Sequence, residues 1–248
     1  MNNLSGKIVL VTGGSKGLGK GIVKLFAEYG ANIAFTYSQD DAAAQNLITE
    51  IEKTQSRCIA IKADVSDFNK SHEVIGEVIT EFGNIHILVC NAGVSRAGAL
   101  WKLKESDWDD VVNTSLKGSF NYIHAVSPHF IEQKYGKIVC IGSINGLRGR
   151  IGGISYNAAK SGLIGLVKTA AAELGGFNIN VNLVAPGFIE TPSQSHTPEL
   201  IRDLVLKECA IKRLGTPEEI APVVVFLCSD ATRHVTGQII KVDAGQYL

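Results

Sequence analysis

The stretch KIVLVTGGSKGLG, residues 7–19, decides the fold. Its first half, residues 7–12, is a short, β-branched and continuously apolar run, which is typical of a strand buried on both faces of a sheet. Glycines follow at positions 13, 14, 17 and 19, and an amphipathic pattern then runs to about Tyr29. A strand that leads through a glycine-rich turn into a helix predicts the first unit of an α/β fold.

Strand-like and helix-like segments alternate along most of the remaining chain. We expect further strands at 32–37, 57–62, 85–90, 137–141, 178–184 and 239–242. We expect further helices at 41–54, 68–82, 105–134, 155–174 and 217–228. This alternation predicts a single α/β domain over residues 1–248, a doubly wound parallel sheet of Rossmann type with about seven strands and helices on both faces.

The segment 191–211 interrupts this alternation. It is polar and contains Pro192 and Pro198, so we expect an excursion from the sheet with one short helix. We interpret residues at about 188–212 as a lid over the substrate.

Composition excludes several classes of function. Lys+Arg and Asp+Glu are both 24, so the near-zero net charge does not suggest a nucleic-acid partner. The N-terminus has no signal-peptide pattern, and no apolar run approaches the roughly 18 residues of a membrane span. The five cysteines form no CxxC pair and the six histidines no HExxH pattern, so we expect no metal site. We therefore expect a soluble, cytoplasmic protein.

The glycine-rich turn TGGSKGLG, residues 12–19, favours a dinucleotide site. Glycines between a strand and a helix let the backbone approach a pyrophosphate, whose charge is met by the N–H groups at the helix N-terminus. The spacing of Gly13, Gly17 and Gly19 differs from the GxGxxG pattern, so a plain glycine turn is the alternative.

The end of the second strand bears on the choice between NAD(H) and NADP(H). An acidic residue there binds the ribose of NAD, but this chain has Tyr37 and Ser38, neither of which repels a 2′-phosphate. Lys16 could pair with that phosphate, so we predict NADP(H) in preference to NAD(H). Asp40 and Asp41 are the opposing observation: we interpret one as a helix N-cap, whereas a longer strand would bring Asp40 to the ribose.

Two other predicted strands also end in candidate ligand-binding residues. Asp64 and Val65 follow the third strand, and Asn91, Ala92 and Gly93 follow the fourth. Ligands bind at the carboxyl ends of strands in such sheets, so we expect these residues near the cofactor.

The stretch IGSINGLRGRIGGISYNAAK, residues 141–160, carries the candidates for catalysis. Tyr156 and Lys160 are four residues apart on a predicted helix and therefore share a face. A cation beside the phenol lowers its pKa from about 10, which would let the tyrosine exchange a proton near neutral pH. Ser143 would supply a second hydroxyl to the same substrate oxygen, so the stretch predicts interconversion of a carbonyl and an alcohol.

Six ordered motifs resemble the short-chain dehydrogenase/reductase family, from about Leu4 to the C-terminus. They are TGGSKGLG at 12–19, NAG at 91–93, NTSLKG at 113–118, Ser143, YNAAK at 156–160 and VAPGFIET at 184–191. Within this family, the segments at 213–230 and 236–245 are similar to 3-oxoacyl-[acyl-carrier-protein] reductases and acetoacetyl-CoA reductases.

The resemblance implies a role for each site residue. Tyr156 would be the general acid in reduction and the base in oxidation, and Lys160 would lower its pKa and hold the nicotinamide ribose. Ser143 would bind the substrate oxygen, and Asn113 would anchor a water in a proton relay. The positions implied for cofactor binding are Gly13, Ser15, Lys16, Gly17, Leu18 and Gly19 at the phosphates and adenosine, Asp64 and Val65 at the adenine, and Asn91, Pro186, Gly187, Ile189 and Thr191 around the nicotinamide half.

The resemblance also implies a reaction and an assembly. The reaction is NADP(H)-dependent reduction of a ketone, a 3-oxoacyl thioester of a carrier protein or CoA, in a homotetramer built through the helices at 105–134 and 155–174. One alternative is a dehydrogenase of a small or cyclic secondary alcohol or of a hydroxyacyl-CoA. A non-catalytic dinucleotide-binding protein is the other, although such proteins usually lack Tyr156 or Lys160, and both are present here.

The chain departs from carrier-protein reductases where a carrier would dock. Those enzymes usually have arginines in the segment that corresponds to 170–180, whereas this chain has Ala172 and Phe177 and keeps only Lys134 nearby. Docking of an acidic carrier is therefore doubtful. Arg148 and Arg150 could instead meet a CoA phosphate, or they could lie in a solvated loop.

Overall fold

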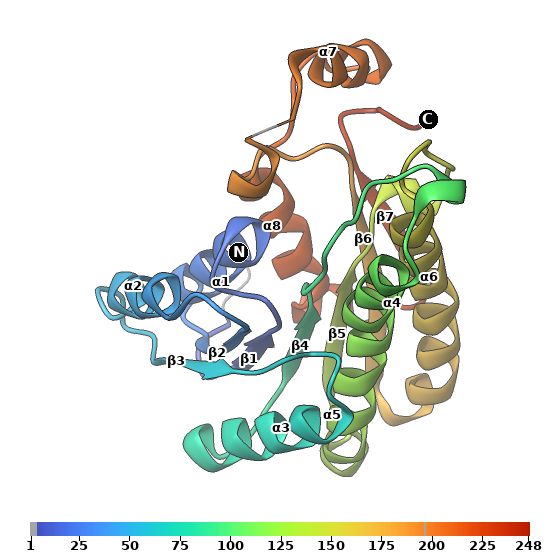
Figure 1. The fold of residues 1–248 in the computed structure, drawn as a ribbon. Helices are drawn as coiled ribbons and strands as arrows, with labels where there is room; N and C mark the ends of the chain where they lie inside the picture. The colour runs from blue at the N-terminus through green and yellow to red at the C-terminus, as the bar shows by residue number, and fades with distance from the viewer. Residues whose placement is uncertain (1–3, 196) are drawn as a thin grey trace.

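A computed structural model describes residues 4–195 and 197–248, and within them seven strands form one parallel sheet (Figure 1). The strand order is β3-β2-β1-β4-β5-β6-β7, which confirms the predicted doubly wound fold. The strands are β1 (Ile8–Val11), β2 (Asn32–Tyr37), β3 (Cys58–Lys62), β4 (Ile87–Cys90), β5 (Gly136–Ile141), β6 (Ile179–Pro186) and β7 (Ile239–Val242).

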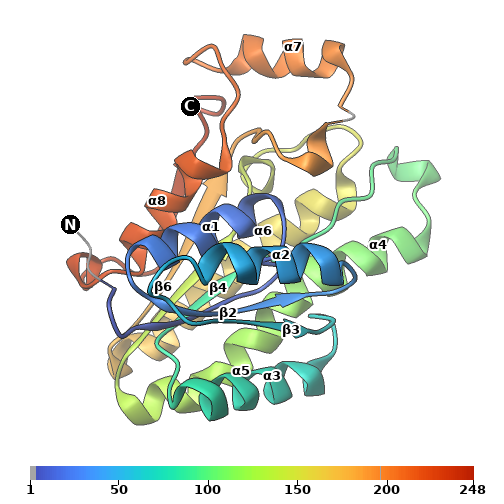
Figure 2. The same cartoon turned by 90° about the vertical axis from the view of Figure 1, so that its left-hand side faces the viewer.

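Helices cover both faces of the sheet, as the edge-on view shows (Figure 2). One layer consists of α1 (Gly17–Glu28), α2 (Asp41–Ile51) and α8 (Pro217–Leu227). The opposite layer consists of α3 (Phe68–Phe82), α4 (Glu105–Val112), α5 (Gly118–Gln133) and α6 (Ile154–Leu174). Among the helices of the described residues, none is both long and apolar enough to cross a lipid bilayer.

The strands alternate their side chains between two hydrophobic cores. In β1, Ile8 and Leu10 pack with the α3–α5–α6 layer, whereas Val9 and Val11 pack with the α1–α2–α8 layer. Every residue of β1 is buried, because side chains on both faces are covered by helices. This explains why the run is continuously apolar rather than alternating.

The chain reverses its direction of winding between β1 and β4. β1 pairs with β2 on one side and with β4 on the other, with Leu10 opposite Ala34 and Leu88. The helices that follow β1 and β4 therefore leave the sheet on opposite faces, and a crevice opens at the carboxyl ends of these two strands.

The predicted helix 105–134 is interrupted in the structure. A π-helical turn, Asn113–Lys117, separates α4 from α5. Side chains before the turn are therefore rotated about the helix axis relative to those after it, compared with an uninterrupted α-helix. At the start of α5, a Cβ on Gly118 would lie 2.8 Å from Val65 Cγ2, which shows how closely the two segments approach. The turn is not visible in the sequence because its hydrophobic spacing remains helical.

Shorter turns and one projecting helix complete the fold. The helix α7 (Glu199–Glu208) lies outside both layers, above the sheet, in the excursion predicted for 191–211 (Figure 1). Single turns occur at η1 (Leu100–Lys102), η3 (Ile144–Gly146), η4 (Gly175–Phe177), η5 (Pro192–Gln194) and η6 (Asp230–Thr232).

Candidate active site

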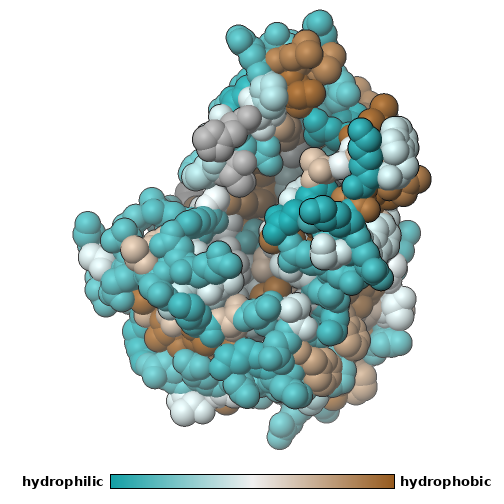
Figure 3. Space-filling model, in the orientation of Figure 1, coloured by the Kyte–Doolittle hydropathy of each residue, from teal (hydrophilic) through white to brown (hydrophobic). Residues whose placement is uncertain are grey.

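A cavity of about 1400 Å³ opens at the carboxyl ends of the central strands. It is lined by the glycine-rich loop, by the ends of β2 to β6 and by segments on either side of α7. The space-filling view is hollowed at this place, below α7 (Figure 3). Since sites for one drug-sized ligand occupy about 300–1000 Å³, this cavity has room for a dinucleotide and a second ligand together.

The glycine-rich loop is shaped to bring backbone close to a ligand. Gly13 and Gly17 have φ of +64° and +53°, a left-handed conformation that favours glycine. A Cβ on Gly19 would lie 2.2 Å from the carbonyl oxygen of Gly13, so only glycine lets α1 start this close to the loop. No acidic residue occurs in the first turn of α1 and no side chain caps it within the described part of the chain, which leaves its N–H groups for an anion.

Hydrogen bonds from β4 hold this loop in place. The Asn91 side-chain amide donates to the carbonyl oxygens of Thr12 and Gly13, both at 2.9 Å. Thr12 Oγ1 accepts from the backbone N–H groups of Asn91 at 3.0 Å and Ala92 at 3.1 Å. Asn91 lines the cavity as predicted, but its amide is already occupied in joining the two strand ends.

Two carboxylate–lysine pairs lie at the end of the cavity next to β2 and α2. Asp40 is the N-cap of α2, accepting from the backbone N–H of Ala43 at 2.8 Å, which confirms the N-cap interpretation. Its carboxylate lies 2.5 Å from Lys16 Nζ, and this contact lowers the pKa of Asp40. Asp41 lies 3.0 Å from Lys62 Nζ. Both lysines line the cavity, whereas Asp40 and Asp41 are outside its described lining.

The structure brings three of the four predicted catalytic residues together. Ser143 follows β5, Tyr156 and Lys160 lie on α6, and all three line the cavity. Lys160 Nζ donates to the carbonyl oxygen of Ile141 at 2.6 Å and lies 5.7 Å from the centroid of the Tyr156 ring. The Ser143 hydroxyl accepts from the backbone N–H of Asn145 at 3.1 Å, which orients the serine.

Burial changes the pKa values of the tyrosine and the lysine in opposite directions. Burial raises the pKa of Tyr156, and a hydrogen bond with Ser143 acts to lower it. Burial also lowers the pKa of Lys160 to about 8, although the Cys140 and Cys90 thiols nearby act to raise it. The predicted lowering of the Tyr156 pKa is therefore wrong in direction, because removing the phenol from water outweighs the other effects.

Asn113, the fourth predicted catalytic residue, lies outside the cavity. It is the first residue of the π-helical turn, and its side chain is exposed. Ser115, two residues later, is fully buried, and its hydroxyl accepts from the backbone N–H of Val94 at 3.3 Å. A Cβ on Gly93 would lie 3.2 Å from Ser115 Oγ and 3.5 Å from Lys160 Nζ, so Gly93 leaves open the space between them. Nothing in the sequence pattern distinguishes Ser115 from Asn113.

The predicted cofactor residues line the cavity with one exception. Ser15 is half-buried in the loop but does not contribute to the wall. The residues that do line it are Gly13, Lys16, Gly17, Leu18, Gly19, Tyr37, Ser38, Asp64, Val65, Asn91, Ala92, Gly93, Pro186, Gly187, Ile189 and Thr191. Thr36 was missed, although its hydroxyl accepts from the backbone N–H of Gly13 at 3.1 Å and it also lines the wall.

The end of α7 is tied to the C-terminal tail and to the arm before Tyr156. Arg148 Nη2 and Gln246 Nε2 donate to the Glu208 carboxylate at 2.6 Å and 2.9 Å. The carbonyl oxygen of Ala244 accepts from the backbone N–H groups of Ala210 and Ile211, both at 3.0 Å. Three segments far apart in the sequence therefore meet above the cavity. No pattern in the sequence predicts that Gln246 takes part.

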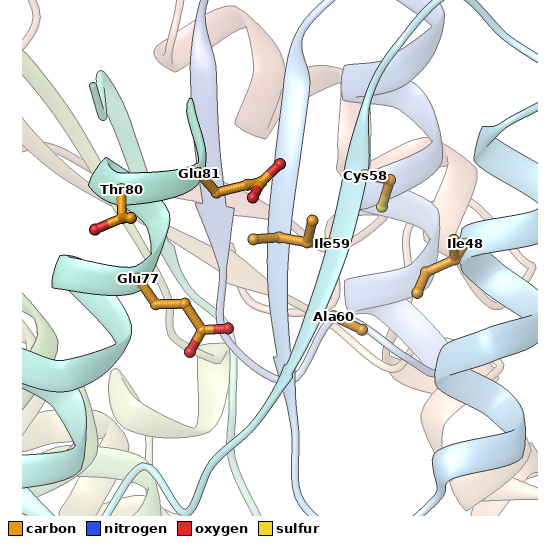
Figure 4. Close-up of a pocket in the computed structure, with 7 residues that line it drawn as sticks. All are labelled: Ile48, Cys58, Ile59, Ala60, Glu77, Thr80 and Glu81. Atoms are coloured by element: carbon orange, nitrogen blue, oxygen red, sulfur yellow. The ribbon is translucent and has the colours of Figure 1, made fainter. Parts of the chain in front are cut away.

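A second cavity, of about 640 Å³, lies around the free edge of β3 (Figure 4). The side chains of Cys58 and Ile59 point to opposite sides of β3. The cavity therefore extends over both faces of this edge strand and does not form one enclosed ligand site. Burial raises the pKa of Cys58 to about 12, which keeps the thiol protonated at neutral pH. We therefore assign the chemistry to the first cavity.

Comparison with known proteins agrees with this geometry. The profile of a family described as enoyl-(acyl carrier protein) reductase matches residues 13–246. The chain belongs to the short-chain dehydrogenase/reductase family. It is 43% identical to a 3-oxoacyl-[acyl-carrier-protein] reductase of Thermotoga maritima over 243 residues, which cover 98% of each chain. Proteins with the same name from Staphylococcus epidermidis and Chlamydia muridarum are each 40% identical, over 98–99% and 99% of the two chains.

Membership of the short-chain dehydrogenase/reductase family makes the protein a nicotinamide-dependent oxidoreductase. The residues of this chain fit such a cofactor, since a Cβ on Gly13 or Gly19 would crowd the neighbouring backbone at 3.0 Å and 2.2 Å, and the uncapped start of α1 lines the cavity. Tyr156 and Lys160 line the same cavity, where a reacting carbonyl can reach them.

The placement of Ser115 beside Lys160 leads to a first prediction. Ser115→Ala should lower kcat for ketone reduction by about tenfold, because the loop after β4, which lies beside Lys160, loses the hydroxyl that binds the Val94 backbone and holds it in place. Asn113→Ala, the matched change on the exposed side of the same turn, should alter kcat by less than about twofold. Steady-state kinetics of both variants tests this, and a larger loss for Asn113→Ala than for Ser115→Ala would contradict it.

The pKa of Lys160 leads to a second prediction. A lysine is charged below its pKa, so the positive charge beside Tyr156 is lost as the pH rises through about 8. We expect kcat/KM for ketone reduction to fall above about this pH, in a profile recorded with saturating reduced cofactor. The Lys160→Arg variant should lose this alkaline limb, because a guanidinium stays charged over the whole range. A wild-type profile without an alkaline limb would refute the assignment.

Proposed function

We propose that this protein is an NADP(H)-dependent reductase that converts the ketone of a 3-oxoacyl thioester into a secondary alcohol. The observation that carries the proposal is the convergence of Ser143 and Tyr156 beside the buried Lys160, in a cavity large enough for cofactor and substrate. Curated relatives at 40–43% identity over nearly the whole chain, named 3-oxoacyl-[acyl-carrier-protein] reductases, support the substrate class.

The proposed mechanism assigns a distinct task to each side chain. The Ser143 and Tyr156 hydroxyls bind the carbonyl oxygen of the substrate and hold its carbon towards the nicotinamide. A bound nicotinamide dinucleotide supplies the hydride. As the oxygen gains negative charge, Tyr156 transfers its phenolic proton to it, and the Lys160 ammonium stabilises the phenolate that remains. Lys160 can do this near neutral pH because its pKa is about 8.

The two hydroxyls also favour a ketone over an enoyl double bond. The matching family is described as enoyl-(acyl carrier protein) reductase, whose name refers to reduction of a carbon–carbon double bond. Ser143 and Tyr156 both line the cavity and are within hydrogen-bond reach of each other, so two donors can bind one oxygen that becomes an alkoxide. We therefore assign carbonyl reduction to this chain.

NADP(H) is the cofactor we propose. The ribose end is lined by Lys16, Tyr37, Ser38 and Lys62, with no carboxylate at the position that would select NAD. Asp40 and Asp41, which are not part of the described lining, form ion pairs with Lys16 and Lys62. Asp40 also serves as the N-cap of α2. A 2′-phosphate could take over part of the pairing with Lys16, because that ion pair is solvent-exposed.

We further propose that residues 1–248 act as one domain, that residues 188–212 form a lid over the substrate, and that the protein is a homotetramer. The contacts of Glu208 with Arg148 and Gln246 support a lid that closes on the arm. Assembly through α5 and α6 is supported by Phe120, which is 44% exposed, and by Gly165, where an added Cβ would meet open space. Gly162 instead packs against Leu116 of its own chain.

The proposed reaction is tested with purified protein, NADPH and acetoacetyl-CoA. We expect oxidation of NADPH, and Tyr156→Phe should lower kcat by about 10³-fold while leaving NADPH binding within about twofold. Absorbance of the reduced nicotinamide gives the rate, and its fluorescence gives the binding. Turnover of crotonyl-CoA instead would indicate an enoyl reductase, and turnover only of a secondary alcohol with an oxidised cofactor would indicate a degradative dehydrogenase.

Cofactor preference gives a separate prediction. In Ser38→Asp, the new carboxylate repels a 2′-phosphate and can accept a hydrogen bond from a free ribose hydroxyl. We expect the ratio of kcat/KM for NADPH to that for NADH to fall by about tenfold or more, measured with one ketone substrate. If wild-type protein already prefers NADH, the proposed NADP(H) specificity is wrong.

A further inference from the structure

The arm between Ser143 and Tyr156 carries two arginines, and the structure gives them different environments. Arg148 is committed to the lid, because its guanidinium binds the Glu208 carboxylate at 2.6 Å and the Gln246 carbonyl oxygen at 3.4 Å. Arg150 has an exposed side chain and lines the catalytic cavity. Of the two, only Arg150 is therefore available to an incoming ligand.

The other cations of the cavity wall are already paired. Four have a carboxylate partner within 3.1 Å, and the fifth, Lys160, is buried and bound to a carbonyl oxygen. The four pairs are Lys16–Asp40, Lys62–Asp41, Lys70–Glu73 and Arg96–Asp110. Within the part of the chain that the structure describes, Arg150 and the buried Lys160 are the cavity-lining cations with no ion pair, and of these two only Arg150 is exposed.

The backbone of Arg150 is nevertheless held in place next to the reacting groups. Its carbonyl oxygen accepts from Asn157 Nδ2 at 3.1 Å and from the backbone N–H of Gly153 at 3.2 Å. Asn157 directly follows Tyr156 in the first turn of α6. The backbone of Arg150 is therefore anchored to this helix, and its side chain extends from there. The nearby Glu208 attracts the Arg150 charge and forms no ion pair with it, since that carboxylate is bound by Arg148 and Gln246.

Exposed hydrophobic side chains lie on the arm that carries Arg150 and on the segment beside it. The backbone N–H of Gly98 donates to the Gly152 carbonyl oxygen at 3.0 Å, which places the segment before α4 beside the arm. Leu100, Trp101 and Ile151 on these segments are 68%, 83% and 101% exposed. Figure 3 shows hydrophobic surface at the upper right, where Figure 1 draws these loops. An apolar rim with one free cation fits a ligand that is uncharged along its length and anionic at its end.

We propose that Arg150 is a specificity-determining residue that binds the phosphate of the phosphopantetheine arm on which a 3-oxoacyl thioester is presented. This inference rests on the proposed function, because that arm is the part of such a substrate that would leave the cavity past Arg150. CoA and an acyl carrier protein both contain the phosphopantetheine phosphate, so the contact does not depend on a basic surface patch for carrier docking. A guanidinium can bind two phosphate oxygens at once, which suits this task.

The experiment compares three acetoacetyl thioesters in wild-type protein and in Arg150→Gln and Arg150→Lys. The substrates are the thioesters of CoA, of holo acyl carrier protein and of N-acetylcysteamine, which lacks the phosphate. In Arg150→Gln we expect KM for the first two to rise about tenfold or more, with kcat nearly unchanged, because a charge-assisted hydrogen bond is lost. KM for the N-acetylcysteamine thioester should not change, and Arg150→Lys should restore part of the loss.

Competition by ligands that cannot react gives a second readout. Phosphopantetheine should inhibit wild-type protein more strongly than pantetheine, and Arg150→Gln should abolish this difference. Arg233→Gln removes the same charge at an exposed site near the start of β6 and should change none of these constants.

Three results would overturn the inference. One is an equal rise of KM for all three thioesters, and another is no rise for any of them. The third is a rise for CoA alone, which would assign Arg150 to the nucleotide of CoA instead of the pantetheine phosphate. Failure of wild-type protein to reduce any thioester would instead refute the proposed function.

Discussion

The hydrogen bonds between Thr12 and the start of the loop after β4 are the constraint on which the rest of the site depends. Asn91 and Ala92 donate their backbone N–H groups to one threonine hydroxyl, and the Asn91 amide donates to two carbonyl oxygens of the glycine-rich turn. These groups lie at the reversal of the sheet, where otherwise unpaired backbone atoms would be exposed to the crevice. Joining the two strand ends keeps the crevice open at a fixed width and holds the loop against the start of α1.

Burial sets the chemical character of the site built on this frame. Tyr156 and Lys160 share a helix face that is removed from water, so burial favours the neutral form of each group. A phenol that stays protonated is a proton donor at neutral pH, and a lysine with a pKa of about 8 still carries most of its charge there. The two shifts in opposite directions therefore suit reduction, in which the tyrosine gives up a proton while the lysine remains positive.

Charge is distributed unevenly around the cavity, and the distribution separates its two ends. At the end of the cavity next to β2, Lys16 and Lys62 are paired with the carboxylates of Asp40 and Asp41 at the start of α2. At the end of α7, Arg148 is bound to the Glu208 carboxylate, whereas the exposed Arg150 lines the cavity with no ion pair among the described residues.

The sequence by itself determined the order of strands and helices, the glycine cradle and the Tyr156–Lys160 pair. Each depends on residues within about one turn or one strand of each other, where local backbone geometry decides which side chains meet. Only the tertiary structure decided that Ser115 is buried close to Gly93 whereas Asn113 is exposed, because the π-helical turn that contains both residues is not recorded in the hydrophobic spacing of the sequence. Likewise, the direction of the Tyr156 pKa shift and the different partners of Arg148 and Arg150 depend on burial and on residues up to about a hundred positions away. Such contacts arise only when the sheet assembles, so no local pattern records them.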